Sequence, residues 1–298
     1  MKPFKLIIAV LVIVLLSSAT NVVANDDSIN EKNGVPRVVF GDALSDAQKQ
    51  TVRELLDVTD NNAVQEYIVT GEDLANYIGG DPSSNMYSSA KITRKNKGFG
   101  LVINVVNDDN ITEVTKEMYA NALLTAGVEN AEVDVASPVK VSGHSALTGI
   151  YKAFNVDGES LDRDRMEVAN EELEIATDLA NNEGIDQEKV SELLTEIKQK
   201  ISEQNPASKE EVEKIVKDQL EELNIQLSKE DMETLTNLFN KMKDINIDFG
   251  KVTSQLEDIA KNIKDRISDV ANDPGFWEGV KKFFASIIDG LKNIFASE

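Results

Sequence analysis

The pattern of apolar residues changes once along the chain, near residue 155, and this change constrains the fold more than any other feature. Before it, short β-branched runs alternate with segments of helical spacing, which is typical of strands alternating with helices. After it, the helical spacing alone continues, through a segment that holds most of the negative charge. The pattern predicts an α+β or mixed α/β domain over residues 35–155, followed by an acidic all-α domain over residues 156–273.

Short runs in the first part have the composition of strands, at 37–40, 64–69, 86–93, 101–106, 131–136 and 139–141. Helices are predicted after Ser45, after Thr70, over 112–126 and over 147–154, and Ser45 with Gln48 has the spacing of a capping box. The run 101–106 is the most strand-like, so we expect a central strand buried on both faces. The run 131–136 alternates apolar and acidic residues, so one of its faces is expected to contact water.

The second part contains several predicted helices, over 161–181, 186–204, 208–223, 228–245 and 252–270. Each has apolar residues recurring every three or four positions. Gly184, Pro206 and Gly250 interrupt the pattern, so we expect a compact antiparallel bundle. An extended coiled coil is the alternative.

Residues 1–24 have the features of a secretory signal peptide, with Lys2 and Lys5 before the apolar run 6–16 and a small residue, Ala24, at the cleavage position. The alternative is an uncleaved anchor, although the run is about half of the roughly 20 residues that a spanning helix needs. Residues 25–34 are polar and are predicted to be a disordered leader. We therefore expect a secreted protein, either extracellular or associated with the cell envelope.

Residues 274–298 form a predicted amphipathic C-terminal helix after a break at Pro274 and Gly275. Its apolar face includes Phe276, Trp277, Phe283, Phe284, Ile287 and Ile288. One interpretation is that this face docks on the protein's own core. The others are contact with a membrane surface or with a protein partner.

The formal net charge of -22 disfavours nucleic acid as a partner, because few cations are present to neutralise phosphates. The chain has no cysteine and a single histidine, His144. A zinc or iron site would then depend almost wholly on carboxylates, so we predict no metal site. No glycine-rich phosphate loop is present, and we predict no cofactor.

The segment Gly143-His144-Ser145 resembles the start of a serine hydrolase motif, placed between a predicted strand and a predicted helix. However, Leu147 replaces the second glycine of that motif. A serine triad also needs a separate histidine, and the only histidine is adjacent to the serine. We therefore predict no catalytic residue, and we expect Ser142 to cap the helix that follows.

A polar cluster, Tyr87-Ser88-Ser89, leaves two interpretations open. Its hydroxyls could satisfy a buried turn. Alternatively, the cluster could line a ligand groove together with Ser142, His144 and Thr148.

Several motifs agree in order with a known family: Thr70-Gly71-Glu72-Asp73-Leu74, Met86-Tyr87-Ser88-Ser89-Ala90, Met118-Tyr119-Ala120-Asn121-Ala122 and, most closely, the segment 136–153. With these motifs the chain resembles the YpuA-like family of secreted proteins of Gram-positive bacteria, which bears a domain-of-unknown-function label. The resemblance implies secretion. It supplies no reaction, cofactor or catalytic residue.

The function that the sequence favours is a non-catalytic binding or interaction role in the cell envelope or outside the cell. The usual catalytic side chains are nearly absent, which supports this choice. The alternative is a hydrolase of cell-wall material that uses an unidentified pair of carboxylates.

Overall fold

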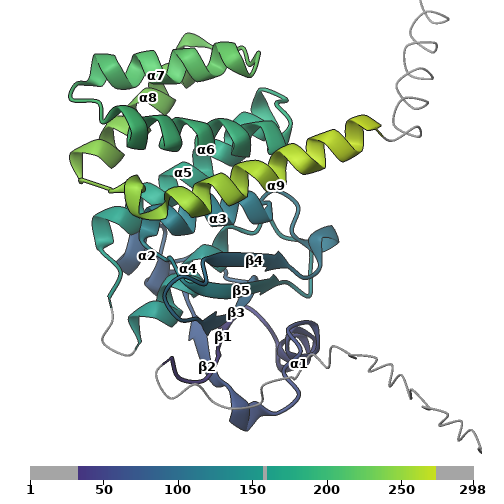
Figure 1. Ribbon diagram of the computed structural model, residues 1–298. Coiled ribbons are helices and arrows are strands. Elements are labelled where there is room, and N and C mark those ends of the chain that lie inside the picture. Colours follow the sequence, from purple (N-terminus) through teal and green to yellow (C-terminus); the bar gives the residue numbers. More distant parts are fainter. Residues whose placement is uncertain (1–32, 157–159, 273–298) are drawn as a thin grey trace, which may run out of the picture.

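A mixed sheet of five strands forms the base of the molecule in the computed structural model, which describes residues 33–156 and 160–272 (Figure 1). Its strand order is β2-β1-β3-β5-β4. The strands are β1 (Arg37–Gly41), β2 (Gln65–Val69), β3 (Ser89–Arg94), β4 (Leu101–Val105) and β5 (Ala131–Ala136). The β1–β2 and β4–β5 pairs are parallel, whereas β3 is antiparallel to both of its neighbours.

The sheet is covered by helices on its two faces. The helices of this part are α1 (Asp46–Leu55), α2 (Gly71–Ile78), α3 (Lys116–Ala126) and α4 (His144–Asn155), with short 3-10 turns η1 (Asn61–Ala63) and η2 (Asp108–Asn110). On one face, α4 packs on β1, β2 and β3 while α3 packs on β4. On the other face, α1 packs through Val52 on Val38 and Phe40 of β1.

Helix starts in this part follow local sequence signals. The capping box predicted at Ser45 and Gln48 is confirmed, because each side chain bonds the other residue's backbone N–H. Thr70 and Asp73 form a second capping box at the start of α2. The predicted water-exposed face of β5 is confirmed as well, since Glu132 and Asp134 are half-buried on it.

The second part is all helical, as predicted, and the helices stack beyond α3 on the side away from the sheet (Figure 1). They are α5 (Arg163–Asn182), α6 (Gln187–Gln204), α7 (Lys209–Glu222), α8 (Lys229–Asp244) and α9 (Thr253–Asn272), with a 3-10 turn η3 (Phe249–Val252) before α9. Neighbouring helices pack side by side instead of forming an extended coiled coil. Within the described ranges, no helix is long and apolar enough to cross a membrane.

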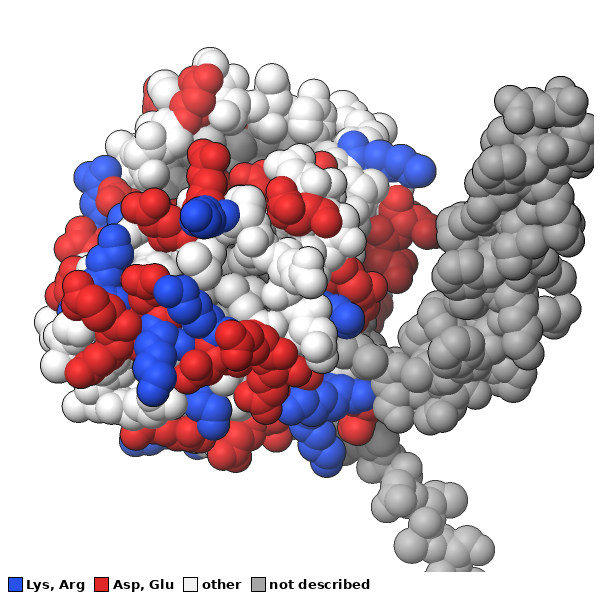
Figure 2. Space-filling model, turned by 90° about the horizontal axis from the view of Figure 1, so that it is seen from above, with Lys and Arg blue, Asp and Glu red and all other residues white. Residues whose placement is uncertain are grey.

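The surface of the helical part carries both signs of charge. Seen from that side, aspartate and glutamate side chains are interspersed with lysine and arginine side chains and with uncharged surface (Figure 2). Some of them form exposed ion pairs, such as Lys241 with Glu171 across α8 and α5 at 2.7 Å. Such pairs contribute little to stability, because solvent screens them.

One hydrophobic core runs through both parts of the chain. It joins Val133 and Val135 of β5 to Leu194 and Ile197 of α6. The predicted boundary at residue 156 adjoins residues 157–159, which lie outside the described ranges, as do the predicted signal peptide, most of the leader and the C-terminal segment 274–298.

The prediction of a central, doubly buried strand at 101–106 is wrong. β4 is an edge strand that pairs with β5, and Val102 is 40% exposed. Only Ile103 is buried, because α3 covers one face of β4 and no described helix covers the other. A run of β-branched residues signals a strand but not its position in the sheet.

The predicted strand at 139–141 is also wrong. Val141 forms a single parallel bridge with Ile111 and no longer ladder. Pro138 has no backbone N–H to donate, and the Ser137 hydroxyl donates to the Val139 carbonyl at 2.7 Å, which favours a turn.

Helix α3 is buried almost all round. All its residues from Glu117 to Ala126 are buried. One side packs on β4, and the others on α5 and α6. The helix therefore forms the centre of the molecule, between the sheet and the helical part.

A buried ion pair joins the three helices at this centre. The Lys198 ammonium of α6 is fully buried and lies 2.5 Å from the Glu172 carboxylate of α5. It also donates to the carbonyl of Asn121 in α3 at 2.8 Å. The Thr125 hydroxyl donates to the other Glu172 oxygen at 2.6 Å, and the Asn121 amide donates to Thr195 at 2.9 Å.

Burial opposes this arrangement, and the hydrogen bonds offset the cost. Removal from water lowers the pKa of the Lys198 ammonium, whereas the adjacent Glu172 carboxylate raises it. The ring of Phe249 lies 5.8 Å from the ammonium and adds a cation–π contact. Breaking one half of such a pair is strongly destabilising, because the other charge stays buried without a partner.

Replacing Lys198 with methionine would leave the Glu172 carboxylate buried alone. We expect the free energy of unfolding to fall by about 3–5 kcal/mol, measured by urea denaturation followed by circular dichroism. The double variant Lys198→Met with Glu172→Met puts apolar groups on both sides and is expected to recover most of the loss.

Lys217→Met is the matched control, because Lys217 forms an exposed ion pair with Glu213 at 2.6 Å. We expect its free energy of unfolding to change by less than about 1 kcal/mol. Equal losses in the two single lysine variants would contradict the importance given to the buried pair.

Candidate functional site

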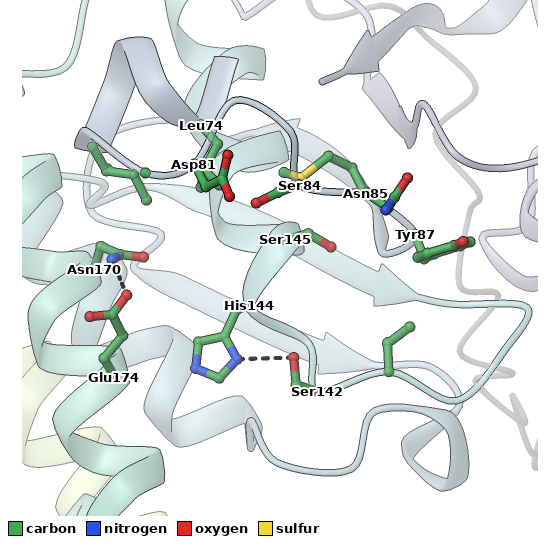
Figure 3. A pocket seen from close by; sticks show the side chains of 14 residues that line it. Leu74, Asp81, Ser84, Asn85, Tyr87, Ser142, His144, Ser145, Asn170 and Glu174 are labelled. Atoms are coloured by element: carbon green, nitrogen blue, oxygen red, sulfur yellow. Dashed lines mark hydrogen bonds between the residues drawn. The ribbon is translucent and has the colours of Figure 1, made fainter. Parts of the chain in front are cut away.

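A hollow of about 520 Å³ lies where α2, the loop after it, the start of α4 and α5 meet (Figure 3). Its polar lining residues are Asp81, Ser84, Asn85, Ser142, His144, Ser145, Asn170 and Glu174. Its apolar lining residues are Leu74, Ile78, Met86, Tyr87 and Val141. No lysine or arginine is among the described residues that line it.

The loop 79–88 is held by specific backbone contacts. Asp81 accepts hydrogen bonds from the N–H and hydroxyl of Ser83, at 2.8 and 2.7 Å. These bonds hold the pKa of the Asp81 carboxyl below its usual range. Further along, the Met86 N–H donates to the Asp42 carboxylate at 3.2 Å. A Cβ on residue 41 would lie 2.1 Å from the Met86 carbonyl oxygen. The loop therefore passes the end of β1 because residue 41 is glycine.

The start of α4 is fixed by Gly143. This residue has φ 111°, in the left-handed region, and a Cβ here would lie 2.7 Å from both Ile111 and the Tyr119 hydroxyl. The buried Tyr119 hydroxyl donates to the Gly143 carbonyl at 2.6 Å. The prediction that Ser142 caps this helix is wrong, because Gly143 is the N-cap and no side chain bonds the free backbone N–H groups.

The Ser142 hydroxyl instead bonds His144, as Figure 3 shows. The Nδ1 atom of His144 lies 3.1 Å from the Ser142 hydroxyl, and Nε2 lies 3.2 Å from the Thr177 hydroxyl. Thr177 already donates its proton to backbone carbonyls of its own helix. It must therefore accept from Nε2–H, which leaves Nδ1 to accept from Ser142.

His144 is held in its neutral form. Burial lowers the pKa of its imidazole, and the nearby carboxylates of Glu113, Glu174 and Asp178 only partly oppose that shift. At neutral pH the ring therefore offers hydrogen bonds without charge.

Ser142 and His144 have the contact of a nucleophile and a base, but the surroundings do not activate it. The second ring nitrogen of a catalytic histidine usually donates to a carboxylate, whereas here it donates to the hydroxyl of Thr177. The lowered pKa also makes the imidazole a weaker base. Ser145, the serine of the motif, accepts from the Ser88 N–H at 3.2 Å instead of contacting the imidazole. The arrangement is suited to hydrogen-bonded recognition.

The structure brings three of the groove candidates together and buries the others. Tyr87, Ser142 and His144 line the hollow. Ser88, Ser89 and Thr148 lie beneath the surface, each only 1% exposed. The candidate contact residues of the predicted C-terminal helix lie outside the described residues; they are Phe276, Trp277, Phe283, Phe284, Ile287 and Ile288.

Sequence reasoning missed several lining residues, above all Asn170 and Glu174 of α5. The Asn170 amide donates to the Glu174 carboxylate at 2.8 Å (Figure 3). Their spacing of four places both on one face of a helix, which was a usable signal. Nothing local showed that this face would meet α4.

Metal ligands are not clustered in the part of the chain that the structure describes. No group of three or more histidine, aspartate or glutamate side chains lies close enough there to hold an ion.

The sequence of this chain matches a known family over most of its length. Residues 40–259 match the family described as "Protein of unknown function (DUF1002)", so the chain belongs to that family. A curated relative is the uncharacterized protein YpuA of Bacillus subtilis (strain 168), which is 37% identical over 268 residues, covering 87% of this chain and 89% of the relative. The resemblance to the YpuA-like family is thus confirmed. No solved structure matches the chain.

The single histidine gives a direct test of the site's electrostatics, because its imidazole signals are unique in a proton NMR spectrum. We expect His144 to titrate with a midpoint below the usual value of about 6.5. In the folded state the proton then binds less readily than in the unfolded chain. Stability from this residue is therefore complete above pH 6.5 and falls as the pH drops from about 6.5 toward the folded-state pKa.

The variant His144→Gln removes the titrating group and serves as the reference. As the pH falls from about 6.5 toward the folded-state pKa of His144, the unaltered protein should lose unfolding free energy relative to His144→Gln. A midpoint at or above the usual value would contradict the described burial of the ring.

Proposed function

We propose that this protein is a non-catalytic binding protein of the cell envelope or the extracellular space. The hollow between α2, α4 and α5 takes a neutral, hydroxyl-rich ligand, such as a saccharide unit. Export rests on the signal-like residues 1–24. Residues 274–298 would supply a second contact, with a partner protein or a membrane surface, through their amphipathic pattern.

The observation that carries this proposal is the combination of side chains in the hollow. Carboxylates, amides and hydroxyls line the hollow together with apolar side chains, and Tyr87, which is 36% exposed, lies at one end of it (Figure 3). Binding sites for small ligands commonly combine an apolar wall with a few polar groups that fix orientation. Hydroxyl groups of a sugar would donate to Asp81 and Glu174, and its C–H face would lie against Tyr87. An anionic ligand would meet carboxylates without a described cation.

The presence of Asp81 and Glu174 in one hollow also favours a second candidate, a glycoside hydrolase with this carboxylate pair. Such an enzyme needs one carboxyl that keeps its proton near neutral pH. Asp81 does not meet that need, because its hydrogen bonds with Ser83 lower the pKa, so Glu174 would have to be the acid. The lining as a whole, in which hydroxyls, amides and apolar side chains outnumber the two carboxylates, favours binding.

Calorimetric titration tests the binding function, with a soluble oligomer of β-1,4-linked N-acetylglucosamine as the probe. We expect a dissociation constant in the micromolar to millimolar range, about −8 to −4 kcal/mol. Glu174→Gln removes a charged acceptor and should weaken binding roughly tenfold or more. Glu233→Gln, at an exposed position of α8, is the matched control and should bind as the unaltered protein does.

Absence of binding at millimolar probe, or equal affinity in the Glu174 variant, would count against the saccharide ligand. Incubation with purified cell wall separates the two candidates. Release of soluble sugars by the protein, lost in Glu174→Gln and retained in Glu233→Gln, would establish the hydrolase instead.

A further inference from the structure

The sheet has two edge strands, β2 and β4, and they differ in how they are protected. β2 carries Gln65 and the charged Glu66, which forms an ion pair with Arg53 at 2.7 Å. β4 reads Leu-Val-Ile-Asn-Val and carries no charge. Natural edge strands usually bear charges, prolines or bulges that prevent pairing with another chain. β4 has none of these.

Half of the backbone groups of β4 face away from the sheet. The Val106 N–H donates to the Val135 carbonyl, and the Ala131 N–H donates to the Gly100 carbonyl. In a parallel ladder the residues alternate, so the even-numbered residues of β4 bond β5. The N–H and C=O groups of Leu101, Ile103 and Val105 therefore point to the open edge. Among the described residues, β5 is the one strand paired with β4.

Apolar side chains accompany this open edge. Val102 and Val106 are 40% and 41% exposed, and both lie on the face of the strand away from α3. Between them, the Asn104 amide donates to Asp134 of β5 at 2.8 Å. An added strand could cover both valines with apolar residues of its own, because neighbouring side chains on one face of a sheet interact.

The opposite side of the edge is acidic. A hollow of about 700 Å³ follows β4 there, beside Ile103 and Val105, and reaches the first turn of α6. Its ionised lining residues are Asp108, Asp109, Glu188 and Lys116. The lining therefore contains three carboxylates and one ammonium, that of Lys116. This ammonium also lies 3.7 Å from the carboxylate of Glu117. This balance favours a cationic occupant.

We propose that the edge of β4 receives an extended, lysine- or arginine-bearing segment of a partner protein, which adds to the sheet as a sixth strand. Backbone hydrogen bonds to Leu101, Ile103 and Val105 would hold the segment. Alternate side chains point to opposite faces of a strand, so apolar residues would cover Val102 and Val106 while basic residues enter the acidic hollow. The site is separate from the hollow between α2, α4 and α5, so the two proposals stand or fall independently.

A short peptide that alternates valine and lysine, acetylated and amidated at its ends, is the probe. Its binding to the full chain is measured by fluorescence anisotropy with a labelled copy. We expect saturable binding that weakens as salt rises. The same peptide with glutamine in place of lysine should bind more weakly and respond less to salt.

Two N-methylated peptides test whether the contact is a strand pairing while the protein stays unaltered. One carries N-methyl groups on its valines and the other on its lysines. Alternate N–H groups of a strand point to opposite sides, so only one of the two sets faces β4. We expect one peptide to lose binding and the other to keep it. Equal binding of both to the protein would overturn the proposal.

The charge contribution is tested by the double variant Asp108→Asn with Asp109→Asn, which should bind the lysine peptide about five- to tenfold more weakly. Its matched control, Glu257→Gln with Asp258→Asn, neutralises two adjacent exposed carboxylates on α9 and should bind as the unaltered chain does. Equal weakening in both would overturn the proposed site. A dimer of the chain alone that excludes the peptide would show that a second copy occupies this edge, and the proposal would then be wrong.

Discussion

The Lys198–Glu172 ion pair constrains how the central helices pack, because neither charge can stay buried without the other. It lies in the centre of the core, where α3, α5 and α6 meet, and both side chains are almost fully buried. An uncompensated charge at this depth would cost several kcal/mol, which disfavours packings of the helices that leave either charge without its partner. In a chain without disulfides, this polar network adds directional contacts to a core that is otherwise apolar.

The helices that form the buried polar network also position the residues around the hollow between α2, α4 and α5. Helix α5 places Glu172 in the core and, two residues before and after it, Asn170 and Glu174 at the hollow. Helix α3 contributes Asn121 to the network and, two residues earlier, Tyr119, whose hydroxyl fixes the Gly143 carbonyl at the start of α4. The two sides of the hollow are therefore joined through the same buried helices. A ligand bound there would meet a preorganised site, which lowers the entropic cost of binding.

Local elements were predictable from the sequence, whereas their positions in space were not. The serine and threonine caps at Ser45 and Thr70 act within one turn of helix, so their spacing alone identifies them. The place of β4 at the sheet edge depends on pairing between distant segments, and its composition resembles that of a buried strand. The same limit applies to Ser142, whose hydroxyl bonds a histidine two residues away because Gly143 turns the chain sharply there. The position of Glu174 near His144 was not predictable either, because it depends on the packing of α5 against α4.

The central claim is that the sheet and the helical part form one cooperative unit around the buried pair. Native-state hydrogen exchange of the full chain in increasing denaturant tests it most directly, by comparing the amides of Val133 and Val135 in β5 with those of Leu194 and Ile197 in α6. We predict that both groups exchange through the same opening, with equal free energies that match global unfolding. Exchange of the α6 amides through a separate opening of lower free energy, while β5 stays protected, would contradict the claim.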